Sequence, residues 1–292
     1  MSSAAEIRAH IKAVSDTEKI TRAMHLISSA KMKRALALHD SNDLYLNRIC
    51  AGIRYIIDNS GFDEHNRYWR DPKECKTAAF VVIAGDKGLC GAFNTDVIRL
   101  ANNVISEHSD ENPLIYPIGH MAAEHFMKRG NCCLDYVHLI HEPDLRNARE
   151  LGMELHQKYL DHEIDEIHIV YTNLIKLGLM EPTARHLLPL NPSDFSTYEY
   201  DWVKNEMGFS FYPSEQAVFN IMVPSFLIGV IYSAMAESFV SEQFSRMTAM
   251  ESSMKNADEM LSSLSMQLNH ARQGQITQEI TEIISGSMMQ GR

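Results

Sequence analysis

The chain has 292 residues, 45% of them hydrophobic, and a formal net charge of −11 with a pI near 5.7. This length and apolar content predict a soluble globular protein with a real core, in one or two domains, and exclude an intrinsically disordered chain. The acidic charge gives no global attraction to nucleic acid or to an anionic membrane.

The cysteines indicate neither a disulfide framework nor a zinc site, because their number is odd and no CxxC pair occurs. They are Cys50, Cys75, Cys90, Cys132 and Cys133. A reducing compartment is therefore expected. Glu6 and Arg8 in the first turns, with no apolar run beside them, argue against a signal peptide.

The first expected element is a helix of unusual length, residues 1–59, because no proline precedes Pro72 and Gly52 is its one helix-weakening residue. Residues 1–58 hold nine Lys/Arg against six Asp/Glu, a local +3 that leaves −14 for the rest. Steps of three and four predict one narrow packing seam with interruptions, formed by Ile7, Ile11, Val14, Ile20, Met24, Ile27, Leu46, Ile49, Ile53 and Ile56.

Residues 76–212 are expected to form a small Rossmann-like α/β domain. Short apolar runs predict strands at Thr77–Ala84, Leu114–Ile118 and Glu166–Tyr171, with Thr183–Leu190 returning antiparallel beside the last. Helical spacing occurs between them, at Asp96–His108, Met121–Arg129 and Leu145–Leu160. This alternation favours a largely parallel sheet.

Residues 213–292 are expected to form a second long helix. Its most apolar part, Ile221–Ala236, is shorter than the roughly 20 residues of a membrane helix and is interrupted by Pro224, so a buried helix is expected. A strict ladder of alternating three- and four-residue steps follows, which is typical of a coiled coil. Its members are Met247, Met250, Met254, Ala257, Leu261, Leu264, Leu268 and Ala271.

The two long helices flank the α/β domain, so they are expected to pair as an antiparallel coiled coil, much of which projects from it. The ladder ends in ARQGQITQEITEIISG, Ala271 to Gly286. Its spacing slips around Gly274, and Ile276, Ile280 and Ile283 form a re-phased stripe among polar side chains. We expect this stripe to face another protein, because the partner helix has ended.

The loop GDKGLCGAFN, Gly85 to Asn94, follows a strand and opens a helix, where a phosphate could be bound. It is neither a Walker loop nor GxGxxG, so a tight strand-to-helix turn is favoured. His138, His141 and His168 could meet at the sheet, but no spacing fixes a metal. We expect no catalytic residue, no cofactor site and no metal site.

Three segments together resemble the gamma subunit of F-type ATP synthases, the central rotor shaft. They are EIRAHIKAVSDTEKITRAMHLISSAKMKRA near the N-terminus, GDKGLCGAFN in the middle, and YSAMAESFVSEQFSRMTAMESSMKNADEMLSSLSMQLNHARQGQITQEITEIISG near the C-terminus. The resemblance spans essentially the full length. It departs from the family's pattern at Asp16, Glu18, Leu268, His270 and Gly274.

The resemblance implies a non-catalytic subunit that couples ion flow through a membrane ring to ATP synthesis or hydrolysis in an alpha-beta head. The implied partners are the alpha and beta subunits, the epsilon subunit and the membrane ring, with no nucleic acid and no membrane span. The implied location is the cytoplasmic face of the cell membrane, as a peripheral protein. Two alternatives stay open: a nucleotide-binding α/β enzyme that uses the Gly85–Asn94 loop, and a rotor-derived coiled-coil adaptor.

The resemblance also implies contact residues. Met24 and Arg246 match family positions near the acidic lever loop of the beta subunit, and the basic run around Lys31, Lys33 and Arg34 could steer against such loops by charge. A polar set matches the positions that touch the catalytic subunits near the top of the shaft, namely Arg272, Gln273, Thr277, Glu279 and Glu282.

Overall fold

The structure, a computed structural model, describes residues 4–60, 66–69, 77–108, 113–129, 131–140, 143–200 and 211–290. The side chains of residues 38, 40, 41, 60, 129, 139 and 286–290 also lie outside this description, as do Cys75 and His141. The chain divides into two compact units: unit 1 joins Met1–Ser28 with Arg246–Arg292, and unit 2 is Ser29–Ser245.

Two long helices begin and end the described chain, as the sequence predicted. Helix α1 is Ala4–Ser60, with 57 residues, and α5 is Glu215–Gln290, with 76. Helix α5 continues through Pro224, so the expected interruption there is wrong. A proline removes one backbone hydrogen bond from a helix. Burial of Val223, Phe226 and Leu227 beside it offsets that loss.

Unit 2 contains a four-stranded sheet in the order β2-β1-β3-β4. Strands β1 (Ala78–Ile83), β2 (Leu114–Ile118) and β3 (Glu166–Lys176) are parallel, and β4 (Leu179–Leu188) pairs antiparallel with β3. The predicted strands are present. The last two are longer than expected and form one hairpin, which turns at Leu177 and Gly178, where Gly178 has φ +89°.

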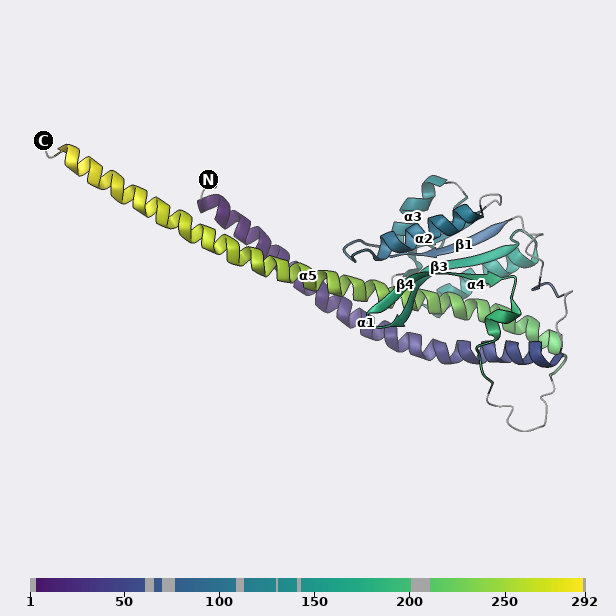
Figure 1. The fold of residues 1–292 in the computed structure, drawn as a ribbon. Helices are drawn as coiled ribbons and strands as arrows, with labels where there is room; N and C mark the ends of the chain where they lie inside the picture. Colours follow the sequence, from purple (N-terminus) through teal and green to yellow (C-terminus); the bar gives the residue numbers. More distant parts are fainter. Residues whose placement is uncertain are drawn as a thin grey trace. The chain divides into compact units, whose positions relative to one another are not determined.

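Helices cover both faces of the sheet, so unit 2 is layered (Figure 1). One face packs against α2 (Phe93–Glu107) and α3 (His120–Phe126). The other face packs against α4 (Leu145–Leu160) and α5. The connections of the described chain include 3-10 turns at Met127–Arg129, Val137–Ile140 and Pro192–Phe195. The mixed α/β class predicted from the sequence is confirmed.

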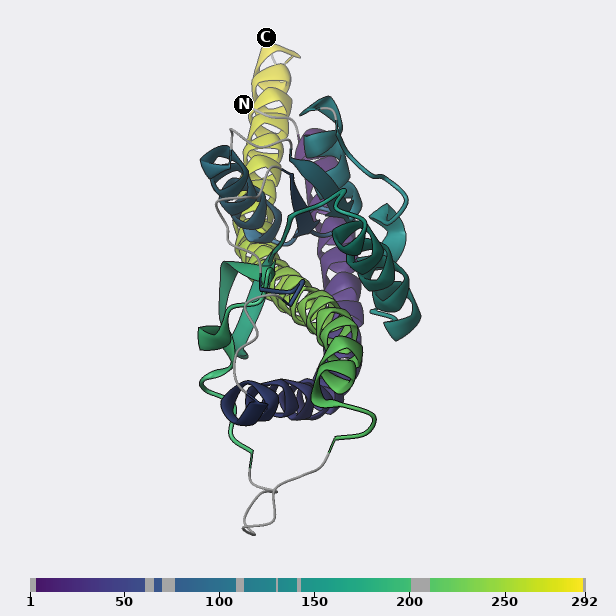
Figure 2. The same cartoon turned by 90° about the vertical axis from the view of Figure 1, so that its right-hand side faces the viewer.

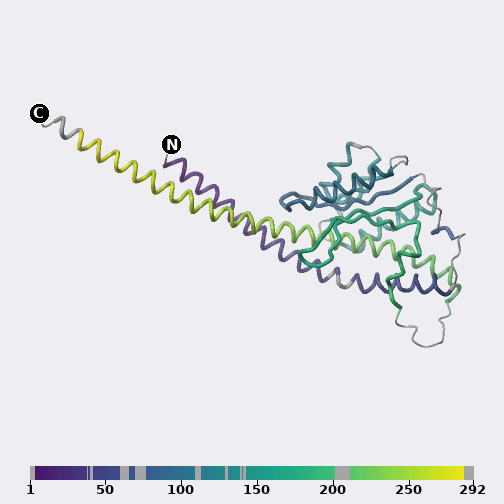
Figure 3. Tube along the Cα trace, in the orientation of Figure 1, coloured from purple at the N-terminus to yellow at the C-terminus, as the bar shows by residue number. Residues whose placement is uncertain are grey.

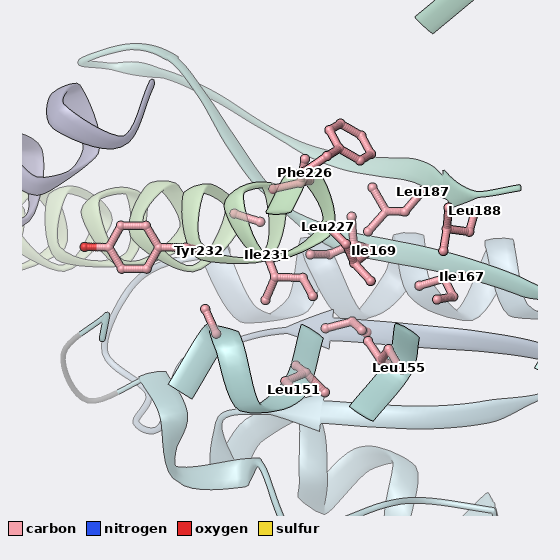
Figure 4. Packing of buried hydrophobic residues seen from close by; sticks show 14 of the residues in the cluster. Leu151, Leu155, Ile167, Ile169, Leu187, Leu188, Phe226, Leu227, Ile231 and Tyr232 are labelled. Carbon is pink, nitrogen blue, oxygen red and sulfur yellow. The ribbon is translucent and has the colours of Figure 1, made fainter. Parts of the chain in front are cut away.

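The larger core lies where α5 meets β3 and β4. Phe226, Leu227 and Ile231 of α5 point toward the side chains of the sheet, and Leu151 and Leu155 of α4 lie on the same core (Figure 4). The sheet side chains are Ile167, Ile169, Leu187 and Leu188. Each buried aliphatic side chain of this kind contributes about 1.5–3 kcal/mol, so α5 is held as an integral layer of unit 2.

Within unit 2, the second half of α1 lies beside the first turns of α5 (Figure 2). Asn42 Nδ2 donates a hydrogen bond to the carbonyl oxygen of Gly229, at 3.2 Å. A Cβ at Gly229 would lie 3.1 Å from Leu46, and one at Gly52 would lie 2.4 Å from Met222. The glycines therefore allow the two helices to approach closely.

In unit 1, the start of α1 lies beside α5 and runs antiparallel to it (Figure 3). The α1 seam differs from the prediction: Ile7 is buried, but Ile20 and Ile27 are 62% and 57% exposed. Their places are taken by Thr21, which is half-buried, and Ser28, which is buried, whereas Met24 is half-buried as the predicted seam requires. In a seven-residue repeat, the same side of the helix faces its partner even where the residues on that side are polar. A prediction from apolar spacing alone therefore placed the wrong residues of this turn on the packed side.

Candidate functional site

The clearest surface feature of unit 1 is a change along α5 at Ala271. Every ladder position from Met247 to Ala271 is buried or half-buried, including Met250 at 3% and Leu264 at 7% exposure. Every residue from Arg272 to Ser285 is exposed. In Figure 3 the N-terminal end of α1 stops beside α5, and α5 continues beyond it. The ladder thus ends where its partner helix ends.

The exposed segment carries both apolar and polar side chains. Ile276, Ile280 and Ile283 are 51%, 51% and 71% exposed. The polar set of Arg272, Gln273, Thr277, Glu279 and Glu282 lies on the same segment, and all five side chains are exposed. Large exposed apolar residues among hydrogen-bonding groups are typical of a protein contact surface.

The hydrogen bonds of the segment are local to the helix. Thr277 Oγ1 donates to the carbonyl oxygen of Gln273 at 2.9 Å, and Thr281 Oγ1 donates to that of Thr277 at 2.7 Å. Gln278 Nε2 donates to Glu282 Oε1 at 3.0 Å. Such surface bonds contribute little to stability and exchange readily with water. The polar set can therefore replace them with hydrogen bonds to another protein with little loss of stability.

Met24 and Arg246 also belong to unit 1. Met24 is half-buried, and Arg246 is only 8% exposed, so most of its side chain is buried. Near Met24 on α1, three large apolar residues are exposed that were not predicted as contacts from the sequence: Ile20, Leu26 and Ile27. The sequence contains a signal for this exposure, because these three residues do not follow the seven-residue repeat. An apolar residue outside the repeat faces away from the partner helix.

Lys31, Lys33 and Arg34 lie in unit 2, on α1. Met32 and Ala35 beside them are buried at 9% and 2% exposure, whereas Lys33 and Arg34 are exposed and Lys31 is half-buried. The three basic residues therefore border the packed side of the helix and form a positive surface, which we call the basic patch.

The Gly85–Asn94 loop is a turn held by its own side chains. Asn94 is 5% exposed; its Oδ1 accepts a hydrogen bond from the Gly85 backbone at 2.8 Å, and its Nδ2 donates to the Lys87 carbonyl oxygen at 3.2 Å. The carboxylate of Glu242 on α5 lies against Gly85. A phosphate placed there would meet the acceptor oxygens of this carboxyl group, so the loop is suited to packing rather than to nucleotide binding.

Two groups of residues in unit 2 have shifted pKa values, and neither forms a catalytic arrangement among the described residues. Burial raises the pKa of Cys50 to about 11, which keeps this thiol unreactive. Burial also raises the pKa of Tyr116 to about 12, and Lys158 Nζ donates to its oxygen at 2.9 Å. Lys158 Nζ also forms an ion pair with Glu154 Oε1 at 2.9 Å, and the Tyr136 hydroxyl donates a hydrogen bond to the same carboxylate. This network joins α4 to the sheet.

The histidines meet differently from the prediction. His168 is close to His108 and Glu166 at the beginning of β3, whereas His138 contacts His120, with ring centroids 5.2 Å apart. His108 was not among the predicted residues, because linear spacing does not show which helix end lies over which strand.

Among the described residues, one helix is long and apolar enough to cross a membrane, within Glu215–Ser285. The apolar window of this helix is 61% buried inside the protein. Core helices often satisfy the same criterion of length and hydropathy, and the packing in Figure 4 matches a core helix.

The fold and these surfaces define a mixed α/β protein whose two long terminal helices carry an exposed contact segment. A family model described as ATP synthase matches residues 3–288. The ATP synthase gamma chain of Ruminiclostridium cellulolyticum is 35% identical over 286 residues, 97% of each chain, and that of Caldicellulosiruptor saccharolyticus is 36% identical over 284 residues, 96% of each.

The fold is also that of a solved chain in the mitochondrial ATP synthase of Euglena gracilis. That structure, of the OSCP/F1/c-ring in rotational state 3, has a TM-score of 0.65 at 15% identity and covers 98% of this chain and 93% of its own. The chain belongs to the ATP synthase gamma chain family. It is a non-catalytic central stalk subunit of an F-type ATP synthase.

Proposed function

We propose that the exposed end of α5 is the part of the stalk that touches the alpha and beta subunits of the catalytic head. The observation that carries this proposal is the change at Ala271, from a packed ladder to an exposed segment with Ile276, Ile280 and Ile283. These isoleucines supply apolar contact area that the chain itself does not cover.

The polar set suits a contact that forms and breaks repeatedly. Arg272, Glu279 and Glu282 supply charge-assisted hydrogen bonds, which are strong and directional, while Gln273 and Thr277 supply neutral ones. Charged groups at a rim favour fast association and specificity more than tight binding. A rotating shaft needs such contacts, because deep apolar burial would hold it in one position.

The basic patch of Lys31, Lys33 and Arg34 is the second proposed contact, directed at acidic loops of the beta subunit. It lies on α1 in unit 2, on a chain whose net charge is −11, so its sign is opposite to that of the protein as a whole. Met24 and Arg246 in unit 1 are proposed to contribute to contacts with the same subunit. The exposed Ile20 and Ile27 near Met24 support this assignment.

The epsilon subunit and the membrane ring are the proposed partners of the α/β part of the chain. The proposed location is the cytoplasmic face of the cell membrane, with attachment through partner subunits. The family membership supports both statements, because its members are subunits of ATP synthase.

The proposal for the α5 end is tested in the assembled complex, reconstituted in sealed vesicles. ATP hydrolysis and ATP-driven ion uptake are measured for a triple variant, I276S/I280S/I283S. We expect ion uptake per ATP hydrolysed to fall. The matched control is M260S/M266S, because Met260 and Met266 are also exposed apolar residues of α5, at 46% and 59%, but precede Ala271. Unchanged uptake per ATP in the triple variant overturns the proposal.

The basic patch is tested by K31Q/K33Q/R34Q in the same assay. We expect a smaller dependence of the hydrolysis rate on salt concentration, since screening by ions acts on exposed charges. The control is K128Q/R146Q/R149Q, which removes three exposed basic residues elsewhere in unit 2. An identical salt dependence in the two variants contradicts the assignment of the patch.

A further inference from the structure

Three ligand-type side chains meet at one edge of unit 2. Glu166 and His168 are alternate residues of β3, so both point to the sheet face covered by α2. His108 is the C-cap of α2 and lies over the same place. The pairing of β1 with β3 sets Phe80 opposite His168, which positions the group on the sheet.

The distances suit a single metal ion. His168 Nε2 lies 2.9 Å from Glu166 Oε2, and His108 Nε2 lies 3.9 Å from the same oxygen. The candidate ligand atoms of the three residues are all within 4.8 Å of one another. Ligands at about 2.0–2.1 Å from a tetrahedral zinc ion are about 3.3 Å apart, so shifts of the order of an ångström or less would place all three on one ion.

The orientation of the His108 ring directs the lone pair of Nε2 toward Glu166. His108 Nδ1 lies 2.8 Å from the carbonyl oxygen of Val104, which can only accept, so Nδ1 carries the hydrogen. In the neutral ring Nε2 is then an acceptor, and it faces the carboxylate of Glu166. A metal ion placed between this nitrogen and the carboxylate oxygen would accept a lone pair from each. A hydrogen bond from the distal ring nitrogen to a backbone carbonyl is the usual support of a metal-binding histidine.

Aromatic contacts hold the two histidine rings in place, and His108 is the most exposed of the three ligands. Phe80 stacks on His168 with ring centroids 5.1 Å apart and meets the His108 ring at 5.4 Å. Glu166 and His168 are 7% and 8% exposed, whereas the His108 side chain is 24% exposed. Within the described chain, the His108 side is therefore the most exposed approach to the group, and a fourth ligand of a bound ion would come from that side.

We propose that His108, Glu166 and His168 form a binding site for a divalent transition-metal ion of the zinc class. Two imidazole nitrogens and one carboxylate oxygen suit zinc and its neighbours, whereas calcium and magnesium prefer oxygen ligands alone. The ion would link the end of α2 to the beginning of β3. Its role is structural, and the site is independent of the subunit contacts proposed above.

The test uses the full chain and zinc chloride alone. Calorimetry and metal analysis after dialysis compare the native chain with H108Q, a change at the most exposed ligand, and with E166Q, which keeps the shape of the side chain. We expect the native chain to bind one zinc ion more than H108Q, and E166Q to bind it at least about tenfold more weakly. The control is H10Q, because His10 is exposed on α1 and far in sequence from the group; it should bind as the native chain does.

The visible absorption of bound cobalt(II) gives a second measurement, which reports the metal site itself and not the stability of the protein. A tetrahedral site with two nitrogen ligands should give a visible absorption band with the native chain and H10Q, and no band with H108Q. Equal zinc uptake by the native chain and H108Q, or no cobalt band in the native chain, overturns the proposal. The three residues would then form a hydrogen-bonded group only.

Discussion

Gly85 at the end of β1 lies directly against the buried carboxylate of Glu242 on α5. A Cβ at position 85 would be 2.9 Å from Glu242 Oε1 and 3.0 Å from its Cδ. Glu242 is 5% exposed. This contact gives the glycine a packing role: the backbone of the loop forms part of the surface on which the long helix packs.

The Gly85 contact predicts that G85A destabilises unit 2. The added methyl group would push against Glu242 and against Asn94 Oδ1 at 3.1 Å, so overpacking of about 1–3 kcal/mol is expected in the free energy of unfolding. Urea unfolding measures this change. The control is G88A, where nothing lies within 4 Å of the new Cβ, and it should change stability by no more than about 0.5 kcal/mol.

A double variant separates this contact from other effects. E242A makes room for the methyl group, so G85A should cost less in the E242A background, by about 0.5–3 kcal/mol. Additive changes in the two variants would mean that Gly85 and Glu242 do not interact.

Ser238 of α5 predicts a second stability effect, since its hydroxyl joins the helix to β3. The Thr172 backbone N–H donates to Ser238 Oγ at 3.1 Å, and Ser238 is fully buried. In S238A this donor loses its acceptor, which should cost about 1–3 kcal/mol. In the control S225A the hydroxyl donates to the carbonyl oxygen of Ile221 in its own helix, at 3.2 Å, so thermal unfolding should change little. Equal losses would contradict the role of Ser238.

His156 predicts an acid-dependent loss of stability. Burial lowers the pKa of His156 from its ordinary 6.5, and its Nε2 lies 2.9 Å from the hydroxyl of Tyr68. Below pH 6.5 the unfolded chain binds this proton more readily than the folded chain. The stability due to the neutral ring is therefore present above the ordinary pKa and is lost as pH falls through the lower, folded value.

The measurement is the free energy of unfolding at about pH 7.5 and about pH 5, where histidine is the titrating side chain. H156Q should lose less stability on acidification than the native chain. H138Q makes the same substitution at an exposed histidine and serves as the matched control. The same slope in H156Q would show that His156 titrates equally in the folded and unfolded chains.

Much of the fold follows from the sequence because it rests on local patterns. The apolar runs at Ala78–Ile83 and Leu114–Ile118 match β1 and β2, and the ladder to Ala271 matches the packed side of α5. The β3–β4 hairpin was partly missed, since its residues beyond Tyr171 alternate weakly. Leu177-Gly178 was the available turn signal. Pro182 in β4 is tolerated because β4 is an edge strand.

The contact segment and the histidine group differ in how far the sequence could indicate them. The exposure of Ile276 and Ile280 could be predicted, because the spacing of apolar residues along the helix shifts around Gly274 in the sequence. The meeting of His108 with His168 depends on which end of α2 lies over which strand, and no periodicity encodes that relationship. Side-chain sites built from distant segments therefore require the three-dimensional fold.

Gly274 provides the last prediction, at the exposed end of α5. It lies in the helix with nothing within 4 Å of a new Cβ, so G274A should stabilise the helix by up to about 1 kcal/mol without a clash. Hydrogen exchange of the backbone amides near residue 274 should slow by up to about fivefold. The control G88A lies in a loop and should leave these amides unchanged. If exchange near residue 274 is as fast in G274A as in the native chain, helix opening there is not limited by the glycine.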